Sequence, residues 1–393
     1  MRRLSANYIF PGDKPPLKNG IIHVDDDGTI LDVIDTGGNL REEASLEFYN
    51  GIITPGFVNA HCHLELSHLK GMVPEHTGLE KFLLKINQDR YFETNLIRKR
   101  VIEGHSEMLQ NGIVAVGDIC NTADSFEVKN QDGIYYFSFL EVFGLNPEKA
   151  DILVQKALDL ASIIKRSAPH PHAIVPHAPY TISEVLFKSL SVYATNQIVT
   201  IHNQESEGEL QLFKNKEGPL LDLLLSMGSY IQNWQPISLN SLDHSLHYLS
   251  AARKILLVHN TYSTDDDIRL ASNSKPQIFW ILCPNANLYI ENQLPDVNLL
   301  INRDQNIALG TDSLASNHHL SILEEMKTLQ YYFPDIPIQS CIEWGTLNGA
   351  RALEMDHFLG SIHTGKKPGL NLIYELNLPD LKLTPESKVK KII

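Results

Sequence analysis

Residues 52–63 read Ile-Ile-Thr-Pro-Gly-Phe-Val-Asn-Ala-His-Cys-His, an apolar run that ends in two histidines one residue apart. The run predicts a buried β-strand over Ile52–Ala60. Residues i and i+2 of an extended segment point to the same side, so His61 and His63 would converge while Cys62 faces away. This geometry predicts a pair of metal ligands. The motif alone is weak evidence, because two hydrogen-bonded histidines at a strand end would look the same.

Seven similar β-rich runs follow along the chain, and most precede a stretch with helical spacing. Such helical patterns include Leu79–Met108 and Asp151–Arg166. Several runs are almost continuously apolar, as in a parallel sheet that is covered on both faces. Eight βα units predict an α/β fold, a (β/α)8 TIM barrel. The predicted strands are Ile52–Ala60, Gly112–Ile119, Gly133–Val142, Ala173–Pro176, Gln197–Ile201, Lys254–Val258, Gln277–Leu282 and Asn306–Leu309.

The two ends of the chain have a different pattern. Ile21–Val24 and Thr29–Val33 flank an Asp-Gly turn, which is typical of a β-hairpin. Short strands are also predicted in the tail, at Gly360–Ile362, Leu370–Tyr374 and Val389–Ile393. We therefore expect residues 1–50 and 361–393 to form a small β-sandwich domain beside a barrel of residues 51–360.

The overall composition argues against some partners and locations. The 393 residues include 33 basic and 47 acidic side chains, a net charge of −14, which disfavours nucleic acid binding. The first residues lack the apolar core of a secretory signal, and no run approaches the roughly 20 apolar residues that span a bilayer. The four cysteines form no Cys-x-x-Cys pair. We expect a cytoplasmic protein with a small-molecule substrate and no membrane partner; association into a homo-oligomer stays open.

Polar residues follow the predicted strands at the positions where active sites of this architecture lie. They are His61 and His63 after the first strand, His177 after the fourth, His202 and Glu205 after the fifth, His259 after the sixth and Asp312 after the eighth. Three imidazoles, from His61, His63 and His202, together with the Asp312 carboxylate would suit one divalent metal ion. Zn²⁺ is the first choice, with Fe²⁺ or Mn²⁺ as alternatives. Such an ion would lower the pKa of a coordinated water to about 7.

Two further residues are placed to move protons to and from that water. Glu205 lies three residues after a predicted ligand, and His259 lies at the next strand end. The alternatives are a surface carboxylate and a core histidine. His177 could contact substrate, support a ligand or pack in its loop. No lysine ends the fourth strand, so the bridging residue of a two-metal site is missing and a single metal is favoured.

Other candidates have a structural interpretation that is at least as good. The second His-x-His pair, His170 and His172, precedes a strand instead of ending one, and we interpret it as a solvated loop feature. Cys120 and Cys283 are expected to be small buried side chains. His244 and His247 lie in a helical stretch and are expected at the surface or in packing. The remaining weak candidates are Glu65, His68, Asn285, His318 and His319.

The pattern of these motifs resembles the amidohydrolase superfamily, and more closely its cytosine deaminase-like, chlorohydrolase and adenosylhomocysteine deaminase branch. The resemblance is carried by Thr54–His63, His202-x-x-Glu205, Val258-His259 and Leu309–Ser313. It implies one catalytic metal, proton exchange at Asp312 and His259, and protonation of a ring nitrogen by Glu205. The stretch Pro176–Thr181 looks like a substrate-contacting segment of the adenosyl-compound deaminases. His63–Ser67 is similar to the aminodeoxyfutalosine deaminases, which act on an adenine-bearing compound.

These patterns and the resemblance together predict a hydrolytic deaminase of an amino-substituted heterocycle, either an adenine-type nucleoside or a free base. Two alternatives stay open. One is hydrolysis of an amide, cyclic amide or halotriazine at the same metal centre, and the other is a metal-binding scaffold without catalysis. The resemblance has one departure, Pro368-Gly369-Leu370-Asn371 in the tail, which lies outside the predicted site. The fold of the connection 206–253 does not follow from its sequence.

Overall fold

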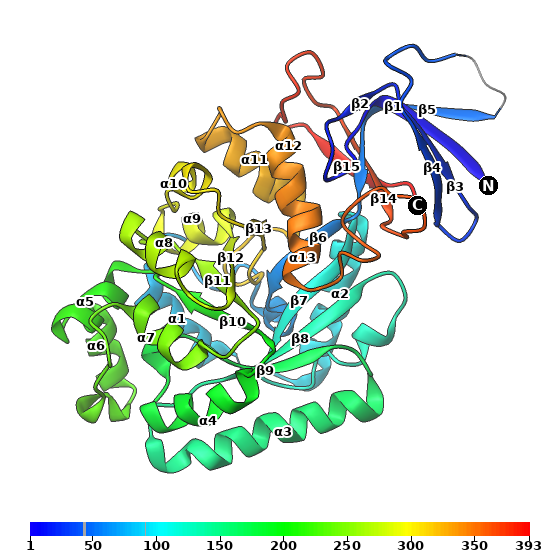
Figure 1. The fold of residues 1–393 in the computed structure, drawn as a ribbon. Helices are drawn as coiled ribbons and strands as arrows, with labels where there is room; N and C mark the ends of the chain where they lie inside the picture. Colours follow the sequence, from blue (N-terminus) through cyan, green and yellow to red (C-terminus); the bar gives the residue numbers. More distant parts are fainter. Residues whose placement is uncertain (42–44, 91) are drawn as a thin grey trace.

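The computed structural model describes residues 1–41, 45–90 and 92–393, which form a mixed α/β fold (Figure 1). Eight parallel strands make up two four-stranded sheets, in the orders β6-β7-β8-β9 and β10-β11-β12-β13. Their bounds are β6 Phe57–Cys62, β7 Ile113–Cys120, β8 Tyr135–Val142, β9 His172–Pro176, β10 Ile198–Asn203, β11 Lys254–His259, β12 Gln277–Leu282 and β13 Ile307–Leu309.

The two sheets meet at both of their edges. At one junction the His202 backbone N–H donates to the His177 carbonyl at 2.9 Å, which links the ends of β9 and β10. At the other, the Thr311 N–H donates to the His61 carbonyl at 3.0 Å, and Cys62 pairs with Asp312 in a parallel bridge. The last strand therefore lies beside the first.

All eight predicted strands are present, but the first is shorter than predicted. The run Ile52–Ala60 is divided at Gly56: β5 (Leu46–Pro55) belongs to another sheet, and β6 begins at Phe57. A Cβ at Gly56 would lie 2.4 Å from Val114 Cγ1. Because such a contact is shorter than packed carbons allow, the chain can cross between the sheets here only at a glycine.

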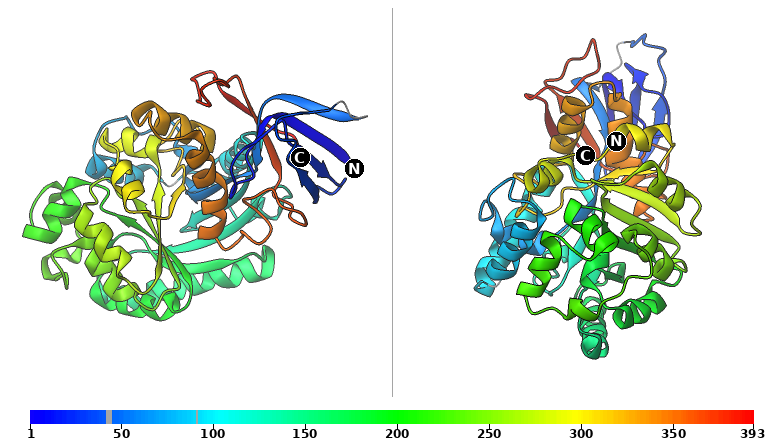
Figure 2. Two further views of the ribbon diagram at one scale, coloured as in Figure 1. Left: turned by 45° about the horizontal axis from the view of Figure 1, so that its top comes forward. Right: turned by 90° about the vertical axis from the view of Figure 1, so that its left-hand side faces the viewer.

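The helices lie outside the parallel strands (Figures 1 and 2). The predicted helix 151–166 is confirmed as α3, whereas the predicted helix 79–108 is divided into α1 and α2. The connection 206–253 contains α5, α6, α7 and one 3₁₀ turn. The bounds are α1 Leu79–Asp89, α2 Thr94–Gln110, α3 Ala150–Ser167, α4 Glu184–Ala194, α5 Glu207–Asn215, α6 Pro219–Ser226, α7 Ser241–Leu249, α8 Asp265–Ser272, α9 Pro284–Glu291, α10 Val297–Asn302, α11 Ile322–Tyr332, α12 Ile338–Glu343 and α13 Gly349–Ala352. Short 3₁₀ helices are η1 Leu64–Leu69, η2 Val128–Asn130, η3 Pro147–Lys149, η4 Pro179–Thr181 and η5 Tyr230–Asn233, and Trp344–Asn348 is a π-helical turn, η6.

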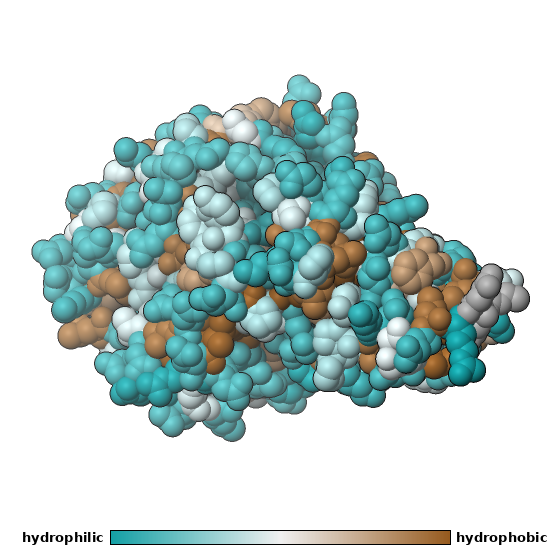
Figure 3. All heavy atoms as spheres, turned by 90° about the horizontal axis from the view of Figure 1, so that it is seen from above, coloured by the Kyte–Doolittle hydropathy of each residue, from teal (hydrophilic) through white to brown (hydrophobic). Residues whose placement is uncertain are grey.

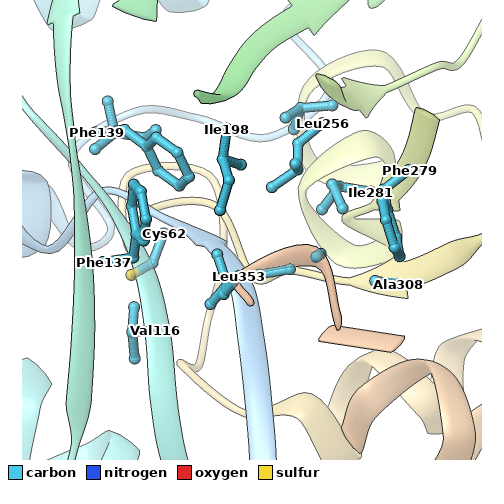
Figure 4. Close-up of a cluster of buried hydrophobic side chains, with 14 of the residues drawn as sticks. Cys62, Val116, Phe137, Phe139, Ile198, Leu256, Phe279, Ile281, Ala308 and Leu353 are labelled. Carbon is cyan, nitrogen blue, oxygen red and sulfur yellow. The ribbon is translucent and has the colours of Figure 1, made fainter. Parts of the chain in front are cut away.

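The space between the eight strands is filled by apolar side chains. Figure 4 shows residues from several strands gathered there, including Val116, Phe139, Ile198 and Leu256, all almost fully buried. Leu353, which follows α13, also contributes to this cluster. The interior is therefore a packed core, and polar chemistry is confined to the strand ends.

The two ends of the chain share a seven-stranded sheet, in the order β15-β14-β5-β1-β3-β4 with β2 on β1. Its strands are β1 Arg2–Ile9, β2 Leu17–Lys18, β3 Ile21–Val24, β4 Ile30–Ile34, β5 Leu46–Pro55, β14 Leu370–Tyr374 and β15 Lys388–Lys391. The predicted hairpin is confirmed as the antiparallel pair β3 and β4. The predicted strand at Gly360–Ile362 is wrong, because this segment is an irregular bend. The Ile362 N–H donates to the Pro11 carbonyl instead of joining a strand pair.

This sheet lies at the opposite end of the molecule from α5 and α6 (Figure 2, left). Seen from above, the surface is mainly hydrophilic with apolar patches between polar side chains (Figure 3). In the described part of the chain, no helix combines the length and the apolar character needed to cross a membrane.

Candidate active site

The carboxyl ends of the parallel strands bring five predicted residues into one buried cluster. His61 comes from β6, and His63 directly follows that strand. His202 comes from β10 and His259 from β11, while Asp312 follows β13. Each of the five is at most 7% exposed. The imidazole ring of His61 lies 4.9 Å from that of His63 and 5.1 Å from that of His202, measured between centroids. The strand order therefore assembles residues that are up to 251 positions apart in the sequence.

Four of these side chains have the geometry of a metal site. The Nε2 atoms of His63 and His202 are 3.3 Å apart, and Asp312 Oδ1 lies 3.7 Å from His61 Nε2 and 3.5 Å from His63 Nε2. Both ring nitrogens of His61 are buried without a hydrogen-bond partner among the described residues. Buried polar atoms are normally hydrogen-bonded, so converging nitrogens without donors fit a bound cation. Three nitrogens and one oxygen match the ligands that Zn²⁺ prefers.

The orientation and protonation of His202 also suit this role. Its Nδ1–H donates to the His177 carbonyl at 2.9 Å, which leaves Nε2 free to face the cluster. Burial lowers the pKa of His63 and His202 well below the ordinary value. Both rings are therefore neutral near pH 7, the form that binds metals.

Glu205 lies beside this cluster and is held by two neighbours. The Tyr180 hydroxyl donates to Oε1, and Oε2 lies 3.5 Å from His259 Nε2. Burial raises the pKa of Glu205 to about 8, so the carboxyl carries a proton at neutral pH. His259 Nδ1 lies 3.0 Å from Asn287 Oδ1, an acceptor that fixes the Nδ1–H tautomer and leaves Nε2 able to accept a proton. Glu205 and His259 thus place a proton donor beside a proton acceptor.

The backbone at these strand ends is strained. Gln204, His259, Asn260 and Asp312 have φ values of 45°, 73°, 60° and 57°, in the left-handed region that non-glycine residues rarely adopt. Such conformations persist where surrounding contacts hold them and are typical of functional sites. At Gln204 the support comes from Glu209, whose carboxylate accepts the N–H groups of Gln204 and Glu205 at 3.1 and 3.2 Å.

Close packing at Gly310 brings Asp312 to its place. A Cβ on Gly310 would lie 2.9 Å from the His61 carbonyl oxygen and 3.0 Å from Cys283 Sγ. A larger residue would push β13 away from β6 and separate Asp312 from the histidines. The glycine of the Leu309–Ser313 motif is therefore needed for close approach of two strands.

A cavity opens from the cluster toward solvent. One wall is polar and contains His177, Asn121, Glu141 and Arg90 beside the cluster. The facing wall is apolar and comes mainly from α1 and α6, with Leu79, Phe82, Leu83, Ile86, Leu223 and Leu224. This mixture of polar and apolar surfaces suits an amphipathic organic molecule.

The structure gathers all seven predicted site residues, because His177 lines the same cavity. Most weaker candidates are accounted for by packing. Glu65 accepts the N–H groups of Asn121 and Thr122, the two ring nitrogens of His68 lie 3.1 and 3.2 Å from backbone carbonyl oxygens, and Cys120 and Cys283 are buried. Asn285 accepts from the Thr328 hydroxyl, and His244 packs in α7. His247, His318 and His319 lie away from the histidine cluster; the latter two side chains are 66% and 60% exposed.

The interpretation of the second His-x-His pair was incomplete. His170 is not simply solvated: its Nε2 lies 2.7 Å from Ser138 Oγ, in contact with a buried polar group of β8. His172 begins β9, and its Nδ1 contacts the His170 carbonyl at 3.1 Å. Neither ring faces the metal cluster, so the pair is structural.

Four residues of the site were missed: Tyr180, Asn287, Glu209 and Glu141. Tyr180 lies in the quoted stretch Pro176–Thr181, but its bond to Glu205 spans 25 positions. Glu209 had a signal, because Ser206 and Glu209 have the spacing of a helix capping box. Ser206 Oγ does accept the Glu209 N–H, yet the Glu209 carboxylate supports the preceding loop. Asn287 and Glu141 carried no signal, since only the fold brings them to the site.

Comparisons with known proteins agree with this geometry. A sequence profile described as the Amidohydrolase family matches residues 52–392, and the chain belongs to this family. A 5'-deoxyadenosine deaminase of Methanococcus vannielii is 27% identical over 359 residues, 87% of this chain and 78% of that protein. Helicobacter pylori aminofutalosine deaminase in complex with methylthio-coformycin has a similar fold, with a TM-score of 0.78 and 20% identity over 95% of this chain and 92% of that one. An adenosine deaminase from Xanthomonas campestris with bound zinc has a TM-score of 0.71 and 21% identity over 98% of this chain and 86% of that one.

Proposed function

We propose that the protein is a metal-dependent hydrolytic deaminase of an adenine-type nucleoside. The observation that carries this proposal is Glu205, a buried carboxyl that is protonated at neutral pH and lies beside the cluster of three histidines and one aspartate. A proton donor at this place is useful for an aromatic heterocycle, whose ring nitrogen gains a proton as water adds to the neighbouring carbon. Hydrolysis of a simple amide has less need of such a group.

The metal would be held by His61, His63, His202 and Asp312. Their three nitrogens and one oxygen fit a divalent ion, and the unpartnered nitrogens of His61 support this assignment. When bound, such an ion supplies a water whose pKa is low enough to give hydroxide near neutral pH. Zn²⁺ is our first choice, with Fe²⁺ and Mn²⁺ as alternatives.

The protein side chains would carry out the proton transfers. His259 Nε2 accepts a proton from the attacking water, because Asn287 holds the Nδ1–H. Glu205 donates a proton to the ring nitrogen, and Tyr180 holds its carboxyl in place. Asp312, whose Oδ2 accepts from Ser316 Oγ at 2.5 Å, exchanges protons with the same water. The proton taken from the water passes on to the amine group and ammonia leaves. The remaining hydroxyl proton then restores the acid form of Glu205 as the ring carbonyl forms.

The substrate class rests on the cavity and on the similar proteins. Their names specify 5'-deoxyadenosine, aminofutalosine and adenosine, all of which carry an amino group on a purine. The apolar wall of α1 and α6 would hold the part of the substrate that is remote from the amine. His177 would contact the bound substrate, since it lines the cavity next to His202.

Finer features of the fold and context complete the proposal. The hydrogen bonds at both sheet junctions support a closed (β/α)8 barrel over residues 51–360. We place the small β domain, predicted as a sandwich, in residues 1–50 and 361–393 and extend it to Pro55, where β5 ends. Cytoplasmic location, the absence of nucleic acid and membrane partners, and the oligomeric state stay predictions from composition.

Ammonia release tests the proposed function. Metal-loaded protein would be assayed with adenosine, 5'-deoxyadenosine, adenosylhomocysteine, aminodeoxyfutalosine, guanine-type nucleosides and cytosine, with metal measured by elemental analysis. We expect turnover of at least one adenine-type nucleoside, lost in both His61→Ala and Glu205→Gln. Metal-loaded protein that is silent on the whole panel yet hydrolyses an amide or halotriazine would overturn the proposal in favour of that chemistry. Metal-loaded protein that turns over no compound, amides and halotriazines included, and binds ligands equally well in wild type and Glu205→Gln would favour the scaffold alternative.

A further inference from the structure

Glu141, at the end of β8, is a buried carboxylate that the proposed chemistry does not use. Its side chain is 4% exposed and lines the cavity. Oε2 accepts from Asn121 Nδ2 at 3.0 Å. No hydrogen-bond donor of the described residues lies within bonding distance of Oε1, which is 3.8 Å from His202 Nδ1. Because Glu141 lines the cavity, this oxygen can accept a hydrogen bond from a donor group that enters the cavity.

Support of a metal ligand does not explain Glu141. Carboxylates often orient a metal-binding histidine by accepting its second N–H. Here the His202 Nδ1–H already donates to the His177 carbonyl at 2.9 Å, and the 3.8 Å separation from Glu141 exceeds hydrogen-bond range. Glu141 is therefore free to interact with the cavity instead.

The carboxylate is held rigidly by its neighbours. Asn121 Nδ2 donates to both Oε2 and the backbone carbonyl of Glu141, at 3.0 and 3.2 Å. Asn121 Oδ1 in turn accepts from Arg90 at 3.0 Å, and Arg90 pairs with Glu65 at 3.5 Å. This chain of contacts fixes Oε2 and leaves Oε1 as the acceptor that faces the cavity. A fixed, buried acceptor discriminates strongly between ligands with and without a matching donor.

The position of Glu141 indicates which part of a substrate it meets. It lies on the Nδ1 side of His202, whereas Nε2 faces the metal cluster, so an imidazole ring separates Glu141 from the reacting end. Glu205 and His259 occupy the other flank of the cluster. A purine whose amine-bearing carbon faces the cluster has its sugar at the far end of the ring system. Sugar hydroxyls are donors, and they are the groups that a lone carboxylate oxygen would pair with.

We infer that Glu141 accepts a hydrogen bond from a ribose hydroxyl of the substrate and so makes the enzyme selective for ribonucleosides. This inference rests on the proposed deaminase function and adds the sugar to the substrate class. Loss of the hydroxyl would remove a hydrogen bond to the Glu141 carboxylate inside the cavity, which costs roughly 10- to 100-fold in binding of the transition state. Free adenine would be a poor substrate for the same reason.

The test is the specificity ratio of kcat/KM between adenosine and its 2'-deoxy and 3'-deoxy analogues. We expect wild-type protein to prefer adenosine by about 10- to 100-fold over at least one analogue. In Glu141→Ala this preference should fall toward unity, mostly through loss with adenosine, while metal content stays at the wild-type level. Glu141→Gln keeps a neutral acceptor and should retain part of the preference. Glu148→Ala, an exposed carboxylate next to α3, is the matched control and should not change the ratio.

The outcomes separate this inference from the proposed function. Deamination that treats adenosine and both deoxy analogues alike, or a preference that persists in Glu141→Ala, overturns the ribose contact while the deaminase stands. Loss of metal in Glu141→Ala with an unchanged ratio would assign Glu141 to ligand support instead. If no compound releases ammonia, the proposed function fails, and calorimetric affinities of the three nucleosides for wild type and Glu141→Ala still decide whether Glu141 binds the hydroxyl.

Discussion

Two buried polar clusters of this protein each contain a histidine of a His-x-His pair, but they differ in how completely their atoms are bonded. In the cluster around Lys129, the ammonium lies 2.6 Å from Asp118 Oδ2, 2.7 Å from Ser138 Oγ and 3.0 Å from Cys120 Sγ. His170 joins through Ser138. The donors and acceptors of this cluster pair with one another. Around His61, by contrast, ring nitrogens converge without any donor between them.

This difference separates a structural cluster from a functional one. A satisfied network fixes the fold, whereas converging ligand atoms without hydrogen-bond partners indicate a site that can bind a cation. A lone unpartnered nitrogen is not sufficient, because His105 and His244 also have one without any neighbouring ligand atoms. Convergence is therefore the criterion, and it can be tested by changing one member of each cluster.

The largest expected effect follows removal of a converging nitrogen. His61→Ala should abolish metal retention and reduce turnover on the order of a thousandfold or more, since the ion contributes several kcal/mol of transition-state stabilisation. Elemental analysis and ammonia release measure the two effects. His172→Ala, in the other His-x-His pair, should leave both close to wild type. One metal per chain and normal turnover in His61→Ala would contradict the assigned ligand set.

Next in size is the proton donor beside the cluster. Glu205→Gln keeps the shape of the side chain but removes the acid, so kcat should fall by roughly 10²- to 10⁴-fold. Metal content should stay unchanged, because Glu205 is not among the proposed ligands. Glu207→Gln, an exposed carboxylate of α5, provides the control. A variant that lost its metal together with its activity would show that Glu205 supports the ion instead of donating a proton.

Sequence reasoning located the converging cluster because its members share a simple rule of position. His61, His202, His259 and Asp312 each follow an apolar run, and parallel strands bring their carboxyl ends to one side. The eight strands were found for the same reason, since each run is short, apolar and bounded by loop residues. Most predicted boundaries differ from the observed ones by one or two residues, and the largest change is at Gly56, where a close contact between distant segments divides the first predicted strand.

The residues that form hydrogen bonds with the site side chains could not be predicted in this way. Asn287 reaches His259 across 28 positions, and Asn121 reaches Glu141 across 20. Asn and Glu side chains are common, and nothing local distinguishes those that face a cavity from those that face water. The role of His170 was missed for the same reason, because Ser138 and Lys129 approach it only after β8 and β9 have paired. Long-range pairing of polar groups needs the fold.

The satisfied cluster should respond in stability instead of catalysis. Lys129→Met leaves the Asp118 carboxylate buried without its cation, a change that typically costs about 3–5 kcal/mol. We expect a clearly lower midpoint of thermal or urea unfolding, with metal still bound by the folded fraction. Lys188→Met removes a lysine from an exposed ion pair with Glu184 and should cost at most about 1 kcal/mol. Equal effects of the two substitutions would show that the buried pair is not a structural anchor.

The smallest expected effect is a dependence of stability on pH that comes from the surroundings of the site and not from the Lys129 cluster. Burial raises the pKa of Glu209 and of Glu325 to about 8, far above that of an unfolded glutamate. Between pH 4.5 and 8 each of these two folded glutamates therefore keeps a proton that its unfolded form has lost, so their contribution to stability falls as pH rises through this window. Burial lowers the pKa of Lys129, but the nearby Asp118 carboxylate raises it by more, so the net pKa is above the ordinary value. Lys129 therefore stays charged throughout this range. From pH 7 to 8.5, above the range in which unfolded histidines titrate, we expect a loss on the order of 2–3 kcal/mol, seen as a drop of a few degrees in Tm. Glu325→Gln should flatten this slope. Glu324→Gln, at the neighbouring and more exposed position, is the control and should leave the slope unchanged. A wild-type Tm that rises with pH would contradict the predicted sign.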